Sequence, residues 1–185
     1  MKILILNLLL LSSSSHAAPI QYQAGQGQVQ VMAIGKPSFI KIKGEGSSPQ
    51  GQIELEDKTA KATFEFDLKS LDTGIELRNE HMKDKYLEVG KHPKAKLVIP
   101  VLTLPKPWTP GQTEVKEQNF SGDLTLHGVT KPVSGVFSVS ADGVVQAKFQ
   151  VKLSNFSIQI PSYMGITVAD SVDVSVKLNE LKTVK

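Results

Sequence analysis

The 185-residue chain contains no cysteine, so it forms no disulfide and offers no attachment site for a lipoprotein anchor. Its fold must therefore be stable without covalent cross-links. Arginine is almost as scarce, because Arg78 is the single arginine among 21 Lys and Arg residues. Aromatic residues make up only 6% of the chain, and the net charge is only +3. These values argue against nucleic-acid binding, because proteins that bind nucleic acids typically have a clustered basic stripe with interleaved aromatics.

Sequence signals of catalysis are also missing. The chain has no G-x-S-x-G, no P-loop and no G-x-G-x-x-G, and its carboxylates are scattered along polar strand faces. Beyond the N-terminal region the histidines are His81, His92 and His127, far apart and each without a second ligand at metal spacing. His127 precedes Gly128 in a turn and is interpreted as a structural hydrogen-bonding residue. We therefore expect no enzyme, no metal site and no cofactor.

The N-terminus has the pattern of an export signal. Lys2 supplies a positive start, residues 3–11 an apolar core, and residues 12–18 a region of small side chains. The apolar run is too short to span a bilayer. We expect residues 1–17 to be a signal peptide cleaved before Ala18, and the protein to be periplasmic. Residues 18–185 have the size of one domain, without repeats or linkers.

Period-two alternation of apolar and polar residues predicts strands along most of this domain. The clearest predicted strand, residues 59–69, places Phe64 and Phe66 on one face and mostly charged residues on the other. Pro100 cannot donate a ladder hydrogen bond and marks an edge or a bulge. Half-buried strands without a helical layer must close on themselves, so we expect an all-β antiparallel barrel of about eight strands. The predicted strands cover residues 28–34, 39–43, 52–56, 59–69, 95–104, 120–126, 133–140, 145–153 and 170–179.

The inward faces of these strands mix Phe with Ala, Gly and Val instead of stacking large residues. This mixture leaves room along the axis and favours an internal cavity, since a barrel of this size either fills with side chains or holds one small ligand. A filled barrel remains the alternative. Trp108, in a proline-rich loop, is expected to pack on its own barrel end rather than on a ligand.

One short helix, of three or four turns, is expected within residues 70–97, inserted between two strands. Thr73 and Glu76 have the spacing of a capping box. Apolar residues at helical spacing, among them Met82 and Tyr86, define one face. Gly90 and then Pro93 end the element.

The same segment carries the basic residues of interest. A lone guanidinium at Arg78, beside Glu80 and His81, suggests bidentate recognition of a carboxylate or phosphate. The alternative is a contact between Arg78 and Glu80 that clamps the helix to the barrel rim. A lysine run follows Arg78, interpreted either as a solvated face or as a surface attracted to anionic lipid. Its members are Lys83, Lys85, Lys91, Lys94 and Lys96.

Two motifs resemble the YceI-like, polyisoprenoid-binding family. The first is L-R-N-E-H-M (residues 77–82), followed by Val89, Lys91 and Pro93; the second is F-S-G-D-L-T-L-H-G-V-T-K-P-V (residues 120–133). The resemblance covers essentially all of residues 18–185 and implies a lipocalin-like barrel that holds a long amphiphile. The chain departs from the family at residues 153–157, which read L-S-N-F-S where the family often has R-T-D-F-G.

The leading interpretation is an exported lipid-binding protein that sequesters or carries an isoprenoid-type or other long-chain amphiphile. The alternative is a structural or stress-response envelope protein with a filled barrel that acts through protein contacts; an enzyme acting on an isoprenoid lipid is disfavoured. Expected partners are the lipid and, transiently, the membrane surface, and a homodimer is left open. The residues expected to contact the ligand are Phe64, Phe66, Arg78, His81, Met82, Tyr86, Leu97, Ile99, Leu124, Leu126, Phe149, Val151, Val174 and Val176.

Overall fold

Twelve strands form a single antiparallel sheet in the computed structural model, which describes residues 20–36, 40–109, 112–163 and 165–184. The predicted signal peptide lies outside the described residues. The strands are β1 (Ile20–Ala24), β2 (Gly27–Lys36), β3 (Lys41–Gly46), β4 (Gln50–Glu56), β5 (Thr59–Asp67), β6 (Lys94–Thr103), β7 (Val115–Leu126), β8 (Val129–Val139), β9 (Val145–Lys152), β10 (Ser162–Tyr163), β11 (Ile166–Leu178) and β12 (Leu181–Thr183).

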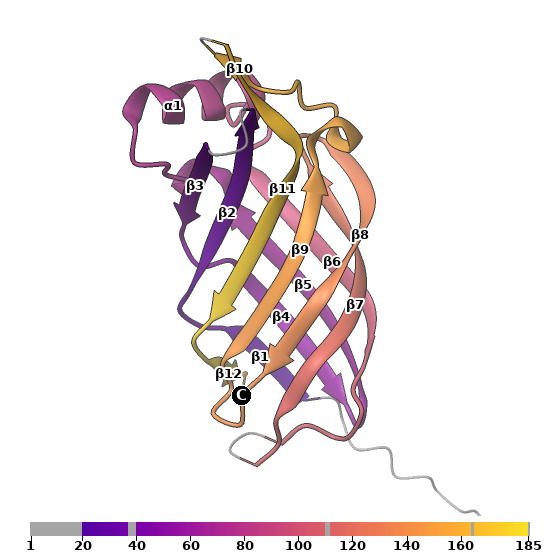
Figure 1. The fold of residues 1–185 in the computed structure, drawn as a ribbon. Helices are drawn as coiled ribbons and strands as arrows, with labels where there is room; N and C mark the ends of the chain where they lie inside the picture. Colours follow the sequence, from indigo (N-terminus) through magenta and orange to yellow (C-terminus); the bar gives the residue numbers. More distant parts are fainter. Residues whose placement is uncertain (1–19, 37–39, 110–111, 164, 185) are drawn as a thin grey trace, which may run out of the picture.

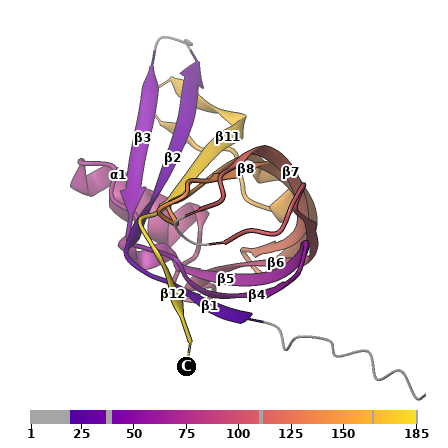
Figure 2. The same ribbon diagram turned by 90° about the horizontal axis from the view of Figure 1, so that it is seen from below.

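The sheet curls into a barrel, with strand order β12-β1-β4-β5-β6-β7-β8-β9-β11-β2-β3 and β10 paired to β11. Seen from below, most strands surround a central axis while β2 and β3 project from the ring on one side (Figure 2). The predicted fold class is confirmed, but the expected count of about eight strands is too low. The strands missing from the prediction are β1, β10 and β12, of five, two and three residues, which are too short to show a clear period of two.

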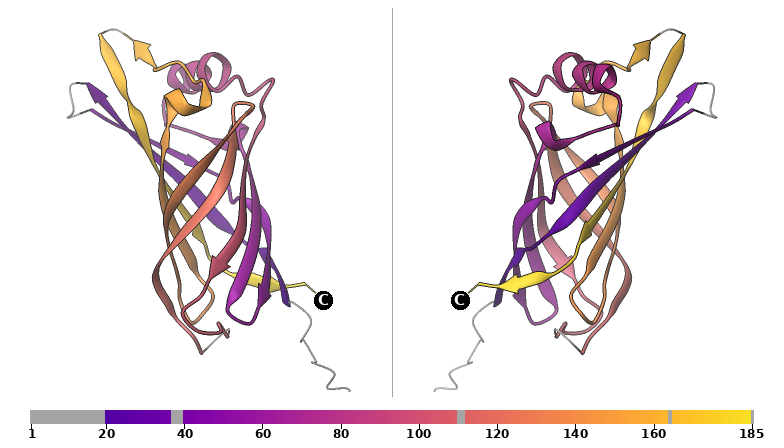
Figure 3. Two further views of the ribbon diagram at one scale, coloured as in Figure 1. Left: turned by 90° about the vertical axis from the view of Figure 1, so that its right-hand side faces the viewer. Right: turned by 90° about the vertical axis from the view of Figure 1, so that its left-hand side faces the viewer.

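The helical segment lies between β5 and β6 in sequence and over one end of the barrel, as Figures 1 and 3 show. It consists of a short 3₁₀ turn η1 (Leu68–Ser70), helix α1 (Glu76–Glu80) and a π-helical continuation η2 (His81–Tyr86). A further 3₁₀ turn, η3 (Leu153–Phe156), follows β9 near the same end. Strand β12 lies at the opposite end (Figure 1).

The predicted capping box is wrong. The N-cap of α1 is Ile75, which has no side-chain cap hydrogen bond. The Thr73 hydroxyl instead donates to Asn79 Oδ1 at 2.8 Å, and the same oxygen accepts from the Thr73 backbone N–H at 2.8 Å. The N-cap therefore lies two residues after the predicted one, and a side chain inside the helix binds the preceding loop.

Two clusters of buried apolar residues occupy the two ends of the barrel. One contains Tyr22, Trp108 and Val115, at the end away from the helix. The other contains Leu68, Leu87 and Phe156, beneath the helical segment. Leu97 and Phe149 pack against both clusters and so connect them along the barrel wall.

Of the edge or bulge expected at Pro100, the structure has the bulge. Ala62 pairs with Ile99 and Ala60 with Leu102, so β6 has one more residue than β5 between these two pairs. The extra residue reverses the alternation. Strict alternation would place Val101 on the same face as Ile99, but with the bulge Val101 is 61% exposed, while Leu102 turns inward.

Gly135 is predicted to tolerate no side chain. A Cβ there would lie 2.7 Å from Phe149 Cβ and 2.8 Å from Phe120 Cε1. We expect Gly135→Ala to lower the free energy of unfolding by roughly 1–3 kcal/mol, measured by urea denaturation. Gly90→Ala is the matched control, because a Cβ at Gly90 meets nothing within 4 Å. Equal effects of the two substitutions would contradict this packing.

Candidate ligand cavity

The barrel encloses a cavity of about 600 Å³ that is lined by members of both core clusters. Its wall is almost entirely nonpolar and receives side chains from the strands around the barrel and from the helical segment. This volume lies within the range of small-molecule sites in proteins. The side-chain-filled barrel, which the sequence left open, does not describe this structure.

All fourteen residues that the sequence singled out line this cavity. Ten come from β5, β6, β7, β9 and β11, and four from α1 and η2. Their contact with a ligand stays a prediction. Sequence reasoning missed Tyr22 and Leu181, since both lie on short terminal strands without clear alternation. It also missed Ile75 and Leu77 as cavity residues, although both have the apolar character expected there.

Phenylalanines line the wall without blocking the axis because glycines face them on neighbouring strands. Gly51 pairs with Phe64 and Gly135 with Phe149. Phe149 also packs edge-on against Phe120, with ring centroids 6.0 Å apart. Since a Cβ at either glycine would overlap its phenylalanine neighbour, the missing side chains let the rings lie close to the sheet.

The end away from the helix is closed by Trp108 and Tyr22. Their rings pack edge-on with centroids 5.5 Å apart, and only 8% of Trp108 is exposed. Trp108 thus packs on its own barrel end, as expected, but it also lines the cavity, and the absence of a ligand contact stays a prediction. Burial raises the pKa of Tyr22 above its usual value. Trp108 Nε1 is buried without a hydrogen-bond partner among the described residues, so this end offers a donor to a ligand oxygen or a water molecule.

At the other end, Arg78 holds the loop that precedes its own helix. Its Nε donates to Thr73 Oγ1 at 2.9 Å and its Nη2 to the Thr73 carbonyl at 2.8 Å. The alternative contact of Arg78 with Glu80 is therefore wrong, because the partner of Arg78 is Thr73, in the loop before the helix. Arg78 also lines the cavity, and these two contacts use two of the five guanidinium N–H groups.

Apolar side chains are exposed beside these contacts of Arg78. Ile75 is 53% exposed and Leu77 48%, yet both also line the cavity, so the apolar wall continues to the surface here. Lys83 and Lys85 follow on η2, with Lys85 Nζ 5.3 Å from the centroid of the Tyr86 ring. Cavity, apolar rim and basic residues therefore lie along one helical segment.

The remaining predicted lysines are less available. Lys94 pairs with Glu65 at 2.7 Å, and Lys91 pairs with Glu88. The hydrogen bond from Lys94 holds the pKa of Glu65 below its usual value. For Glu88, hydrogen bonds first from Lys91 and then from His127 lower the pKa. Two lysines of the run are thus paired, Lys91 before β6 and Lys94 on it, while Lys83 and Lys85 lie on η2.

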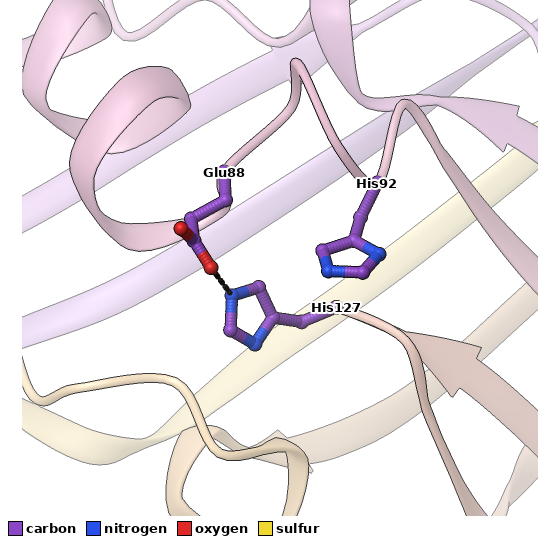
Figure 4. Close-up of side chains that lie close together, drawn as sticks. All are labelled: Glu88, His92 and His127. Atoms are coloured by element: carbon purple, nitrogen blue, oxygen red, sulfur yellow. Dashed lines mark hydrogen bonds and ion pairs between the residues drawn. The ribbon is translucent and has the colours of Figure 1, made fainter.

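Three polar residues meet outside the cavity, contrary to the expectation that the histidines are far apart. Glu88, His92 and His127 each place a possible ligand atom within 4.8 Å of the others (Figure 4). His127 Nε2 lies 2.9 Å from Glu88 Oε2, and the two imidazole rings pack edge-on with centroids 5.1 Å apart. The predicted structural role of His127 is consistent with its second contact, to the Phe156 carbonyl at 3.1 Å.

Glu88 and His127 both hold left-handed backbones, with φ of 44° and 51°. Such a conformation costs a non-glycine residue roughly 1–2 kcal/mol, so the surrounding contacts must hold these two residues in place. Sequence reasoning missed this cluster because His127 is 39 residues from Glu88. The local signal for the cluster is the spacing of four between Glu88 and His92, in the stretch where the sequence predicts the end of the helix.

Within the described ranges, no helix has the length and apolar character needed to cross a membrane. The fold and the cavity together define a lipocalin-like barrel with a nonpolar interior. A family model, the YceI-like domain, matches residues 22–179. The chain belongs to the YceI-like family, and the resemblance drawn from its two motifs is confirmed.

Curated relatives include UPF0312 proteins of pseudomonads. That of Pseudomonas savastanoi pv. phaseolicola is 37% identical over 97 residues, which cover 52% of this chain and 40% of the relative. That of Pseudomonas fluorescens is 29% identical over 130 residues, covering 65% and 62%. The matched part of this chain thus spans less than two thirds of the length of either relative.

Solved structures share the fold at low sequence identity. A polyisoprenoid binding domain from Saccharophagus degradans, implicated in plant cell wall breakdown, is 18% identical with a TM-score of 0.60, over 85% of this chain and 95% of that one. Burkholderia cenocepacia BcnA is 19% identical with a TM-score of 0.63, over 82% and 94%. At these identities the likeness establishes the fold.

Proposed function

We propose that this protein binds a long-chain amphiphile, of isoprenoid or fatty-acyl type, inside its barrel and carries or sequesters it. The observation that carries the proposal is the nonpolar cavity of about 600 Å³. The similarity to a structure described as a polyisoprenoid binding domain supports the same ligand class. We place the protein in the periplasm, exported by residues 1–17, on the pattern of its leader.

The energetics suit a carrier. Burying each methylene of a chain is worth about 0.8 kcal/mol relative to water. Relative to a bilayer the same transfer is nearly neutral, because both environments are nonpolar. The protein can therefore exchange its ligand at a membrane without an energy source. The exposed Ile75 and Leu77, which join the cavity to the surface, mark the exchange end.

The alternative of an envelope protein acting only through protein contacts required a filled barrel, so the cavity favours the binding function. Catalysis finds less support, because the cavity wall is almost entirely nonpolar. The direct test is to purify the protein from its own cell envelope, extract it with organic solvent and identify lipids by mass spectrometry. We expect a long-chain amphiphile approaching one per chain. An extract no richer than that of a cavity-blocked variant would contradict the proposal.

Val174→Trp is such a variant. Val174 lines the cavity on β11, opposite Phe149, so an indole there should occupy space that a ligand chain needs. Excluding two methylenes weakens binding by about 1.6 kcal/mol, or roughly fifteenfold, measured with a fluorescent long-chain fatty acid. Val136→Trp, on the outward face of β8, is the control and should bind like the parent. If the two variants bind equally, the ligand does not occupy this part of the barrel.

Arg78→Lys separates recognition of a head group from the contact with Thr73. A lysine keeps the charge but cannot donate to both Thr73 oxygens in the geometry of a guanidinium, so we expect a loss of roughly 1–2 kcal/mol in stability. We also expect the substitution to reduce the affinity for a long-chain fatty acid more than the affinity for the hydrocarbon of equal length. Thr73→Val is the control, since it removes the hydroxyl contact while the guanidinium remains.

Melting temperature and both affinities are measured on each variant. Recognition of the head group predicts that Arg78→Lys, and not Thr73→Val, weakens the fatty acid selectively. If Arg78→Lys lowers the affinity for both ligands equally, Arg78 does not recognise the head group and only binds Thr73.

Contact with a membrane surface is proposed for the helical segment. Lys83 and Lys85 should attract anionic lipid, each contributing about 1 kcal/mol near the surface. We expect the double substitution to glutamine to reduce co-sedimentation with phosphatidylglycerol vesicles at low salt. The same change at Lys61 and Lys148, on the outer wall, should have little effect. If both double substitutions reduce co-sedimentation equally, the protein is attracted to the vesicles by its net charge and not by this segment.

A further inference from the structure

We propose that Glu88, His92 and His127 form a binding site for a divalent cation of the zinc type, separate from the lipid cavity. The three residues lie where the segment after η2 meets the turn between β7 and β8 (Figure 4). Their neighbours Leu87 and Leu126 line the cavity, whereas these three side chains do not. The proposal is independent of any lipid ligand.

The contacts of His127 determine how its ring is used. A backbone carbonyl only accepts hydrogen bonds, so the contact of Nδ1 with the Phe156 carbonyl at 3.1 Å requires the proton on Nδ1. With the proton on Nδ1, the lone pair of Nε2 faces the Glu88 carboxylate at 2.9 Å. Two acceptors at this distance repel each other unless a positive species lies between them. That species is a second ring proton or a metal ion. An imidazole whose Nδ1–H is held by a carbonyl while Nε2 faces outward is the usual arrangement of a metal-bound histidine.

His92 completes the set from the same turn as Glu88. The Glu88 carbonyl accepts the His92 backbone N–H at 2.9 Å, so residues four apart are held as on a helical turn. The His92 ring packs edge-on against His127, and its Cε1 lies where a side chain at Gly128 would project. Neither ring nitrogen of His92 has a hydrogen-bond partner within the described part of the chain, which leaves a lone pair available as a ligand.

Two imidazoles and one carboxylate are a typical zinc donor set, and three protein ligands leave the fourth tetrahedral position to water. The side chain of His127 is 13% exposed and that of Glu88 34%, so the site is partly shielded yet accessible. Lys91, which pairs with Glu88, is 72% exposed and can move into solvent when the ion binds. The ion would fasten the helical segment to the β7–β8 turn.

The test uses the purified chain, freed of metal with EDTA and titrated with zinc chloride by isothermal calorimetry near neutral pH. We expect one ion per chain, and a melting temperature that rises with zinc concentration, because the ion binds only the folded state. His92→Phe keeps the ring that packs on His127 but removes a ligand. It should weaken zinc binding at least tenfold without lowering the melting temperature of the metal-free protein.

His81→Gln is the matched control, since His81 is a histidine outside the cluster, and it should bind zinc like the parent. Glu88→Gln should also weaken the binding. The proposal is overturned if His92→Phe and the parent bind zinc equally, or if His81→Gln weakens binding as much as His92→Phe does. Because the titration contains no lipid, its outcome is distinguishable from failure of the lipid-binding proposal.

Discussion

The pairing of glycine with phenylalanine across neighbouring strands is the constraint on which the open barrel depends. At Gly51 the Phe64 ring occupies the place of the missing side chain, and at Gly135 that place is taken by Phe149 Cβ and the Phe120 ring. The wall thereby gains the large apolar surface that stabilises the sheet, while the axis remains free. A barrel that stacked its aromatic rings on the axis would gain similar burial and lose the cavity.

Stability is then concentrated at the two ends. Trp108 and Tyr22 close one end by ring packing. At the other end polar contacts hold the helical segment, with Arg78 bound to Thr73 before it and Glu88 bound to His127 after it. The helix is short and changes to π geometry at His81, so its position depends on these contacts more than on its own backbone hydrogen bonds.

Much of the cavity could be predicted because the inward or outward direction of a strand residue is a local property. Phe66, Ile99 and Val176 could all be assigned to the wall from alternation alone. Val101 could not, because the bulge at Pro100 shifts the phase, and the sequence does not show on which residue the shift takes effect. Arg78 could be recognised by its scarcity, but its partner depended on where the helix begins.

The sequence by itself determined the class of fold, the family and the apolar character of the interior, since alternation, turn residues and the two motifs are all local along the chain. Only the tertiary structure decided which short strands complete the sheet and that the barrel is hollow. It also brought His127 to Glu88 across 39 residues. Those features depend on strand register and on how side chains from distant strands share space, and neither is encoded within any one segment.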